Sequence, residues 1–509
     1  MTGQARTRQR RTAADLIRLI SDEGSYRTWD EEPIQPELGE DYAAELAAAR
    51  ERSGVDESIV TGEARIDGRR VVLIACEFQF MAGSIGLASA ERFVAAMERA
   101  TRERLPVLAS TASGGTRMQE GTIAFVAMVK ISAAIATHQR AGLPYLTYLR
   151  HPSTGGALAS FGSLGQVVVA EPGALVGFLG PRVFEALNGT PFPSGIQSAE
   201  NLARIGVIDG VLPAEELREM IARTLRVLRP PSYENLLERS ADRAESWPEL
   251  ESSGSDEAWA SILRTRDARR PGLRELLRVA ATDVVPLSGT GQGERDPGLS
   301  LCLARFDGVP VVLVGQDRRT QRSRAPLGPG ALRAARRAMH LADELRLPLV
   351  TVIDTPGAAL SAAAEEGGLA AEIAHCLADL AMHAGPTLSV LLGEGTGGGA
   401  LALLPADRTV AAEHAWLSPL PPEGASAIMY RDTSHAPGLA QQQGVASGSL
   451  RRNGIVDVIV PERADAADEP EEFCSRMGGT ISAELAALML EQKEHRLSRR
   501  HERYRRLGP

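Results

Sequence analysis

The chain has 509 residues, of which 43% are hydrophobic and 24% charged, and its net charge at pH 7 is −9. This length predicts two or more domains with sizeable cores. The negative charge argues against a nucleic-acid partner, because phosphate binding requires a positive field. No unbroken apolar run reaches the roughly 18 to 20 residues of a membrane span, and no apolar segment follows the charged N-terminus as in a secretory signal. We therefore expect a cytoplasmic protein with no membrane partner.

Alternating strands and helices are predicted along both halves of the chain, which indicates an α/β fold. In the first half we expect strands at residues 71–76, 107–110, 145–149, 167–170 and 175–178, and helices at 87–104 and 120–141. In the second half we expect strands at 311–314, 349–353, 388–392 and 408–411, and helices at 330–345 and 366–384.

An acidic stretch rich in Ser, Pro and Gly separates the two halves and has the composition of a linker. We place the linker at residues 241–256, between domains at 1–240 and 257–509. The second domain ends in a basic helix. Residues 6–11 and 496–506 are both rich in Arg. We interpret them as solvated tails, with docking of an acidic partner as the alternative.

Cysteine and lysine are scarce. The four cysteines form no CxxC pair, so neither a zinc site nor a disulfide framework is indicated. Lys130 and Lys493 are the only lysines, one in an apolar helical run and one in a charged terminal helix. Neither has the setting of an attachment site for a covalent cofactor. No GxxxxGK[ST] motif is present, which excludes a P-loop nucleotide site.

The chain repeats itself. The sequence GGALA occurs at residues 155–159 and again at 398–402, and in both places it follows an apolar strand and a polar step. The offset of 243 residues also carries TASGG at 111–115 onto DTPGA at 354–358. Matches in the same order over more than a hundred residues predict two copies of one α/β unit.

The two glycine clusters are candidate oxyanion sites. The N-terminus of a helix presents free backbone N–H groups, glycine allows a substrate carbonyl to approach them closely, and the preceding loop can add further donors. The alternative is that the glycines only allow close packing, and the repetition favours the site. The candidate donors are Gly155 and Gly156 with loop partners Gly114 and Gly115, and Gly398 or Gly399 with Ala400 and loop partners Gly357 and Ala358.

Other polar residues near these turns have simpler explanations. The run Asp354-Thr-Pro-Gly357 resembles the DxxG motif of GTPases, but no phosphate loop precedes it. Spacing gives a nucleophilic serine no His/Asp partner, and a polar loop histidine is the commoner explanation of His151. Four further residues complete this set of candidates: Ser113, Ser153, Glu394 and Glu423.

At this point the residues resemble a known family. The first copy is similar to the carboxyltransferase β subunit of bacterial acetyl-CoA carboxylase, through CEFQFMAGSIG (76–86), TASGGTRMQEG (111–121) and GLPYLTYLRHPSTGGALASF (142–161). The second copy is similar to the α subunit, through PLVTVIDTPGA (348–358) and GEGTGGGALAL (393–403). The chain thus resembles a fusion of β and α subunits.

The resemblance implies two tandem crotonase-like domains built of spiralling ββα units. It also implies that a carboxyl group moves from carboxybiotin, held by a separate carrier protein, to the α-carbon of a short acyl-CoA. Acetyl-CoA is the first expected substrate and propionyl-CoA the second. A biotin carboxyl carrier protein and a biotin carboxylase would be partners, and the site would lie between subunits of a homodimer or larger assembly. The first copy would face acyl-CoA and the second biotin.

Three departures from the family pattern stand out. The zinc ribbon of the β subunit is missing, so no zinc is expected. The α-type loop DTPGAYPG here reads DTPGAALS at 354–361, and Thr116 replaces the usual Ala. The altered loop motivates two alternatives, an acyl-CoA decarboxylase on the same fold and a catalytically silent scaffold subunit.

Overall fold

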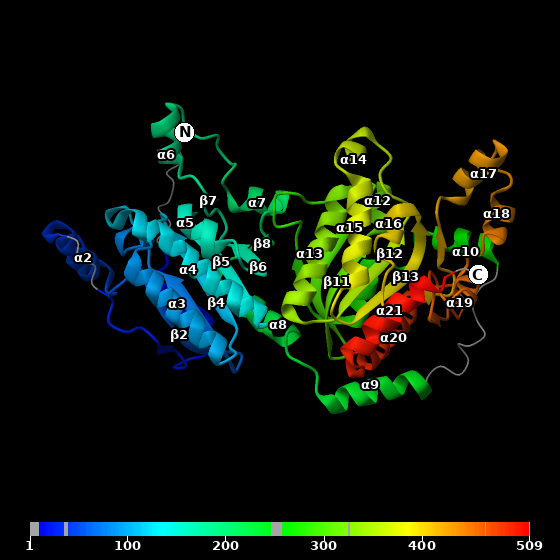
Figure 1. The fold of residues 1–509 in the computed structure, drawn as a ribbon, viewed down its shortest axis with the longest axis horizontal. Coiled ribbons are helices and arrows are strands. Elements are labelled where there is room, and N and C mark those ends of the chain that lie inside the picture. The colour runs from blue at the N-terminus through cyan, green and yellow to red at the C-terminus, as the bar shows by residue number, and fades with distance from the viewer. Residues whose placement is uncertain (1–9, 35–38, 246–256, 324–325, 464, 508–509) are drawn as a thin grey trace. The chain divides into compact units, whose positions relative to one another are not determined.

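The computed structural model describes residues 10–34, 39–245, 257–323, 326–463 and 465–507 (Figure 1). The chain divides into two compact units, Met1–Ala222 and Arg223–Pro509. Each unit is built on one mixed sheet with helices packed against it.

The first unit contains an eight-stranded sheet in the order β1-β2-β3-β4-β5-β6-β8, with β7 paired to β5. From β3 onwards all neighbouring strands are parallel, while β2 and β3 are antiparallel. The strands are β1 (Arg27–Thr28), β2 (Ile59–Ile66), β3 (Arg69–Cys76), β4 (Val107–Ser113), β5 (Tyr145–Thr154), β6 (Val167–Ala170), β7 (Val176–Gly177) and β8 (Gly210–Val211). The helices are α1 (Ala13–Ile20), α2 (Glu40–Ser53), α3 (Leu87–Arg102), α4 (Gly121–Arg140), α5 (Gly155–Ala157), α6 (Pro181–Asn188), α7 (Ala199–Ile205) and α8 (Ala214–Val227), the last crossing into the second unit.

The second unit repeats this plan with the order β16-β14-β13-β12-β11-β10-β9 and β15 paired to β13. Here β9, β10 and β11 are antiparallel and the rest parallel. The strands are β9 (Ala281–Leu287), β10 (Leu299–Phe306), β11 (Val309–Gln316), β12 (Leu349–Thr355), β13 (Thr387–Thr396), β14 (Arg408–Ala412), β15 (Trp416–Ser418) and β16 (Val458–Val460).

The helices of the second unit include two long C-terminal ones that have no counterpart in the sequence predictions for the first half. They are α9 (Tyr233–Glu245), α10 (Ala258–Thr265), α11 (Leu273–Ala280), α12 (Arg318–Ser323), α13 (Pro329–Leu345), α14 (Ala362–Glu366), α15 (Leu369–Met382), α16 (Gly397–Leu401), α17 (Pro422–Tyr430), α18 (Ala436–Gln442), α19 (Ser447–Arg452), α20 (Pro470–Leu490) and α21 (Lys493–Arg505).

The division between the units falls earlier than the predicted boundary at residue 240. Helix α9 packs against α20 and therefore belongs to the second unit. Its buried Leu236 supplies an apolar contact that composition alone did not assign to either side. Most of the predicted linker, residues 246–256, lies outside the described residues.

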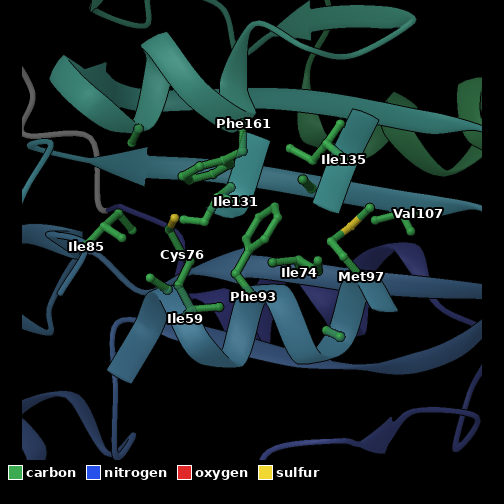
Figure 2. Packing of buried hydrophobic residues seen from close by; sticks show 14 of the residues in the cluster. Ile59, Ile74, Cys76, Ile85, Phe93, Met97, Val107, Ile131, Ile135 and Phe161 are labelled. Carbon is green, nitrogen blue, oxygen red and sulfur yellow. The ribbon is translucent and has the colours of Figure 1, made fainter. Parts of the chain in front are cut away.

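The core of the first unit lies between the sheet and the helix pair α3 and α4. Figure 2 shows Phe93 and Met97 of α3 pointing toward Ile74, Val107 and the α4 side chains Ile131 and Ile135. The rings of Phe93 and Phe161 lie 5.0 Å apart between centroids. This packing fixes the carboxyl ends of β4 and β5, from which the candidate loops emerge.

The basic stretch at the C-terminus is not a solvated tail. Arg500 of α21 is 1% exposed and pairs with buried Asp407, with Nε–Oδ1 and Nη2–Oδ2 distances of 2.8 and 2.6 Å. The same guanidinium donates to the carbonyl oxygens of Leu380 and His383 at the end of α15. Charge counting predicted solvation, and it missed that an aspartate far away in sequence lies beneath this helix.

Candidate active site

In the first unit, two loops meet at the carboxyl ends of adjacent parallel strands. Strands β4 and β5 run in register up to the pair Ser113 and Ser153. Beyond that pair the loop after β4 contacts the first turn of α5. A Cβ built on Gly155 would lie 3.2 Å from the Cα of Gly115, and one built on Gly115 would lie 3.4 Å from the Gly156 nitrogen. Only glycine allows the two chains to come this close.

Most N–H groups of these loops are already used inside the protein. The N–H of Gly114 donates to the Ala82 carbonyl (2.9 Å), that of Gly115 to the Ser113 hydroxyl (3.0 Å) and that of Gly155 to the Phe178 carbonyl (2.9 Å). These three glycines shape the loops and are not free donors, which corrects the sequence prediction of a full set of loop donors. Among the described residues, no acceptor is found for the N–H groups of Gly156 and Thr116.

The second unit has the same construction. The N–H of Gly357 donates to the Thr355 hydroxyl (3.1 Å), as Gly115 does to Ser113. A Cβ built on Gly399 would lie 3.5 Å from the Ala358 nitrogen, so this loop also contacts the following glycine turn. The N–H groups of Gly398 and Ala358 have no acceptor among the described residues. Ala400 is buried at the fourth position of α16, where intrahelical hydrogen bonding begins.

The structure shifts the alignment of the two copies by one residue. Gly155 and Gly397 both begin a helix after a strand, with φ of 62° and 67°. Gly115 and Gly357 share a positive φ and the same hydroxyl acceptor two residues earlier. Both pairs are 242 residues apart, not 243. Gly156 therefore corresponds to Gly398, and Thr116 to Ala358, because the extra glycine of the second cluster made the sequence match slip.

A buried polar network supports the second site. The Gln316 side chain donates to the Gly399 carbonyl (2.7 Å) and accepts from the Asp354 N–H (3.1 Å), so it joins both loops. Asp354 in turn accepts from the Glu394 N–H (3.1 Å) and from Arg318 (3.2 Å). Burial raises the pKa of the Asp354 carboxyl in spite of the Arg318 charge.

A different network supports the first site. Arg117 is 1% exposed and donates to the carboxylate of buried Glu57 and to the Ser84 carbonyl (2.9 Å). Burial alone would lower the pKa of the Arg117 guanidinium, but the hydrogen bonds to Glu57 outweigh it and raise that pKa. Glu120, which also contacts Arg117, accepts from the N–H of Leu87 at the start of α3. Arg117 thereby ties the candidate loop to neighbouring elements.

The other candidates turn out to have structural partners. His151 Nδ1 accepts from the Leu175 N–H (3.1 Å), and burial, with the nearby Arg10 charge, lowers the pKa of its imidazole. Ser113 serves the Gly115 N–H, and the Ser153 hydroxyl donates to the Arg150 carbonyl (2.7 Å).

The two glutamates near the second glycine turn are also engaged. Glu423 pairs with Arg266, whose hydrogen bonds lower the pKa of this carboxyl. Glu394 pairs with Arg322, although burial raises the Glu394 pKa. In the part of the chain that the structure describes, no group of three or more His, Cys, Asp or Glu could hold a metal ion.

Both sites thus consist of two backbone donors at the carboxyl edge of a parallel sheet, and neither contains a nucleophile paired with a base. This arrangement stabilises negative charge on a carbonyl oxygen. It defines an enzyme class that handles thioester enolates or similar oxyanions through the backbone.

Comparisons with known proteins agree with this class. The Carboxyl transferase domain family model matches residues 4–503. A Mycobacterium tuberculosis (strain ATCC 25618 / H37Rv) protein named "Probable biotin-dependent acyl-coenzyme A carboxylase beta3 subunit" is 56% identical over 500 residues, covering 98% of either chain. The "Acetyl-coenzyme A carboxylase carboxyl transferase subunits beta/alpha" of Salinispora tropica is 37% identical over 481 residues, covering 92% of this chain and 84% of that protein.

Among solved structures, a transcarboxylase 12S described as a hexamer assembly superposes with a TM-score of 0.73 at 20% identity, covering 94% of this chain and 90% of that one. The chain belongs to the carboxyl transferase family, as a carboxyltransferase of biotin-dependent acyl-CoA carboxylases. Its two units are tandem crotonase-like domains, as the resemblance implied.

Proposed function

We propose that this chain transfers the carboxyl group of carboxybiotin, carried by a separate protein, to the α-carbon of a short acyl-CoA, with acetyl-CoA as the first substrate to test and propionyl-CoA as the second. The observation that supports this proposal is the pair of free backbone N–H groups in each unit, on Gly156 and Thr116 and on Gly398 and Ala358. Removing the α-proton of a thioester places negative charge on its oxygen, and such donors stabilise that charge.

The second unit suits the ureido oxygen of biotin, which is an acceptor and would lie between the N–H groups of Gly398 and Ala358. Carboxybiotin, when bound, supplies the carboxyl group. The rim beside it is formed by residues 359–361, where the Leu360 side chain is 95% exposed and Ser361 caps α14 through the Ala364 N–H (3.2 Å). This rim, which lacks the Tyr-Pro-Gly of the resembled family, offers an apolar contact to the carrier-borne ring.

We also propose that the chain works with a biotin carboxylase and a biotin carboxyl carrier protein and assembles with further copies of itself. An apolar surface on α4 supports self-association. Its exposed side chains are Met118, Ile123, Phe125, Val126 and Val129. By length and composition alone, the helical stretch Met118–Arg140 could also cross a membrane, with 33% of its most apolar window buried. One side of this helix packs into the core, which favours a protein partner on the other.

The deciding experiment is a reconstituted assay on a panel of acyl-CoA thioesters with biotin carboxylase and carboxylated carrier protein supplied. We expect carboxylation of a short acyl-CoA. Turnover of malonyl-CoA without the carrier would instead identify a decarboxylase. A properly folded Gly156→Val variant that keeps full transfer activity would contradict the role of the first site, and a wild-type chain that transfers nothing would leave the scaffold hypothesis.

A further inference from the structure

The two sites differ at one side chain. Thr116 and Ala358 hold equivalent positions, each paired through an isolated bridge to the segment before the first long helix, at Ile85 and Leu327. Thr116 carries a hydroxyl where Ala358 carries only a methyl group. The first site therefore has a hydrogen-bonding group that the second lacks.

The Thr116 hydroxyl lies beside the free donors of the first site. A Cβ built on Gly156 would lie 2.8 Å from Thr116 Oγ1, closer than to any other atom outside its own turn. The next nearest atoms are those of the Met128 thioether, at 3.5 and 3.6 Å. The hydroxyl thus stands at the first turn of α5, against the glycine whose N–H is free.

Nothing in the described protein uses this hydroxyl. Other hydroxyls around the site are engaged: Ser113 serves the Gly115 N–H, Thr154 donates to the Ser113 carbonyl (3.1 Å), and Ser160 donates to the Gly156 carbonyl (2.6 Å). Among the described residues, Thr116 Oγ1 has no donor or acceptor partner. Thr116 is half-buried, so its hydroxyl remains open to a bound molecule.

Building on the proposed function, we propose that the Thr116 hydroxyl is a third hydrogen-bond donor to the thioester oxygen of acyl-CoA, acting with the N–H groups of Gly156 and Thr116 itself. The hydroxyl donates its own proton in a hydrogen bond, and no bond to it forms or breaks. An enolate oxygen carries a full negative charge, and a hydrogen bond to a charged acceptor is worth more than one to a neutral carbonyl. The extra donor in the first unit therefore assigns the acyl-CoA to that unit and the biotin to the second.

The test compares Thr116→Val, which keeps the shape and removes the hydroxyl, with Thr116→Ser, which keeps the hydroxyl. We expect Thr116→Val to lower kcat/KM for the acyl-CoA about tenfold and Thr116→Ser to stay within about twofold of wild type. Thr137→Val, a change of the same kind at an exposed α4 position, is the control. Thermal unfolding of each variant, measured beforehand, should match wild type.

A second measurement separates hydrogen bonding from site shape. S-ethyl-CoA is a thioether that lacks the carbonyl oxygen, so its inhibition constant should be the same for wild type and Thr116→Val. Equal loss of its binding, equal loss of activity in Thr116→Ser, or full activity in Thr116→Val would each overturn the inference. A wild-type chain that carboxylates no acyl-CoA in the same assay would overturn the proposed function itself, which is a distinguishable result.

Discussion

Gly115 and Gly155 lie against each other so closely that neither has room for a side chain: a Cβ on Gly155 would stand 3.2 Å from the Gly115 Cα. The two residues come from different loops, and their contact sets the separation of the free N–H groups on Thr116 and Gly156. Because both have positive φ, glycine is required here for conformation as well as for space.

Gly155→Ala should therefore lower carboxyl transfer by more than about tenfold, since the new methyl group must push the loops apart and misplace the donors. Gly68→Ala is a matched control, because Gly68 has a φ of 75° but nothing within 4 Å of a built Cβ. It should cost a similar backbone strain, about 1 kcal/mol, and leave kcat unchanged. Steady-state kinetics of both variants, beside urea unfolding, would check this. Equal activity of the two variants would contradict the role of the contact.

Gln316→Leu should destabilise the second unit and reduce transfer. It leaves the Gly399 carbonyl and the Asp354 N–H buried without partners, at about 1 to 3 kcal/mol for each group. Denaturant unfolding measures the stability loss, and transfer activity measures the effect on the loops. Gln442→Leu, on an exposed position of α18, should change neither. Unaltered stability of Gln316→Leu would show that the network does not hold the loops.

The stability of the first unit should fall on acidification through His138. This side chain is buried, its Nδ1 lies 2.9 Å from the Thr101 hydroxyl and its Nε2 3.2 Å from the Pro144 carbonyl, an arrangement that suits the neutral ring. Burial lowers the pKa of His138 from 6.5 to about 4.

Because the unfolded chain takes up this proton first, the contribution of His138 is complete above about pH 6.5 and is lost as the pH falls toward 4. The loss amounts to about 3 kcal/mol in all. Urea unfolding between pH 4 and 7 should give a flatter pH dependence for His138→Gln than for wild type. Parallel curves for the two proteins would show that His138 is not the titrating group.

Arg500→Met should cost about 3 to 5 kcal/mol of stability, since it leaves Asp407 charged and buried without its partner. The double variant Arg500→Met with Asp407→Asn should recover part of that loss, because the uncompensated charge is gone. Arg506→Met, at an exposed position of the same region, is the control. Chemical denaturation of the four proteins would detect the coupling, and a double variant no better than the single one would argue against it.

Val129→Glu should weaken self-association, because it places a charge in the apolar surface of α4. Sedimentation velocity over a range of concentrations would show a shift to smaller species, with Gln442→Glu as a charge control on another exposed helix. An unchanged distribution for Val129→Glu would show that this surface does not join copies of the chain.

The sequence predicted much of the sheet architecture, because strands that are buried on both faces are continuous apolar runs and the duplication shows each run twice. The antiparallel strands β2, β9 and β10 were missed, because their apolar residues are interrupted by charged or polar ones. The glycine clusters could be found because only glycine satisfies both a positive φ and the close approach of two loops.

Three features required coordinates. Which glycine N–H groups are free depends on acceptors such as Ala82 and Phe178, which lie in other loops. The one-residue slip in the alignment arose because three consecutive glycines allow two matches. Thr116 could be noted only as a substitution, since nothing in its spacing shows that its hydroxyl lies beside Gly156.

The pairing of Arg500 with Asp407 also constrains how the protein is made. Asp407 leaves the ribosome 93 residues before its partner is synthesised. Until then the nascent second unit lacks the cation that neutralises this carboxylate, and it cannot be fully closed. The first unit contains all of its own strands much earlier and is free to fold while translation continues. The last helix to be synthesised is thus the one that completes the second domain.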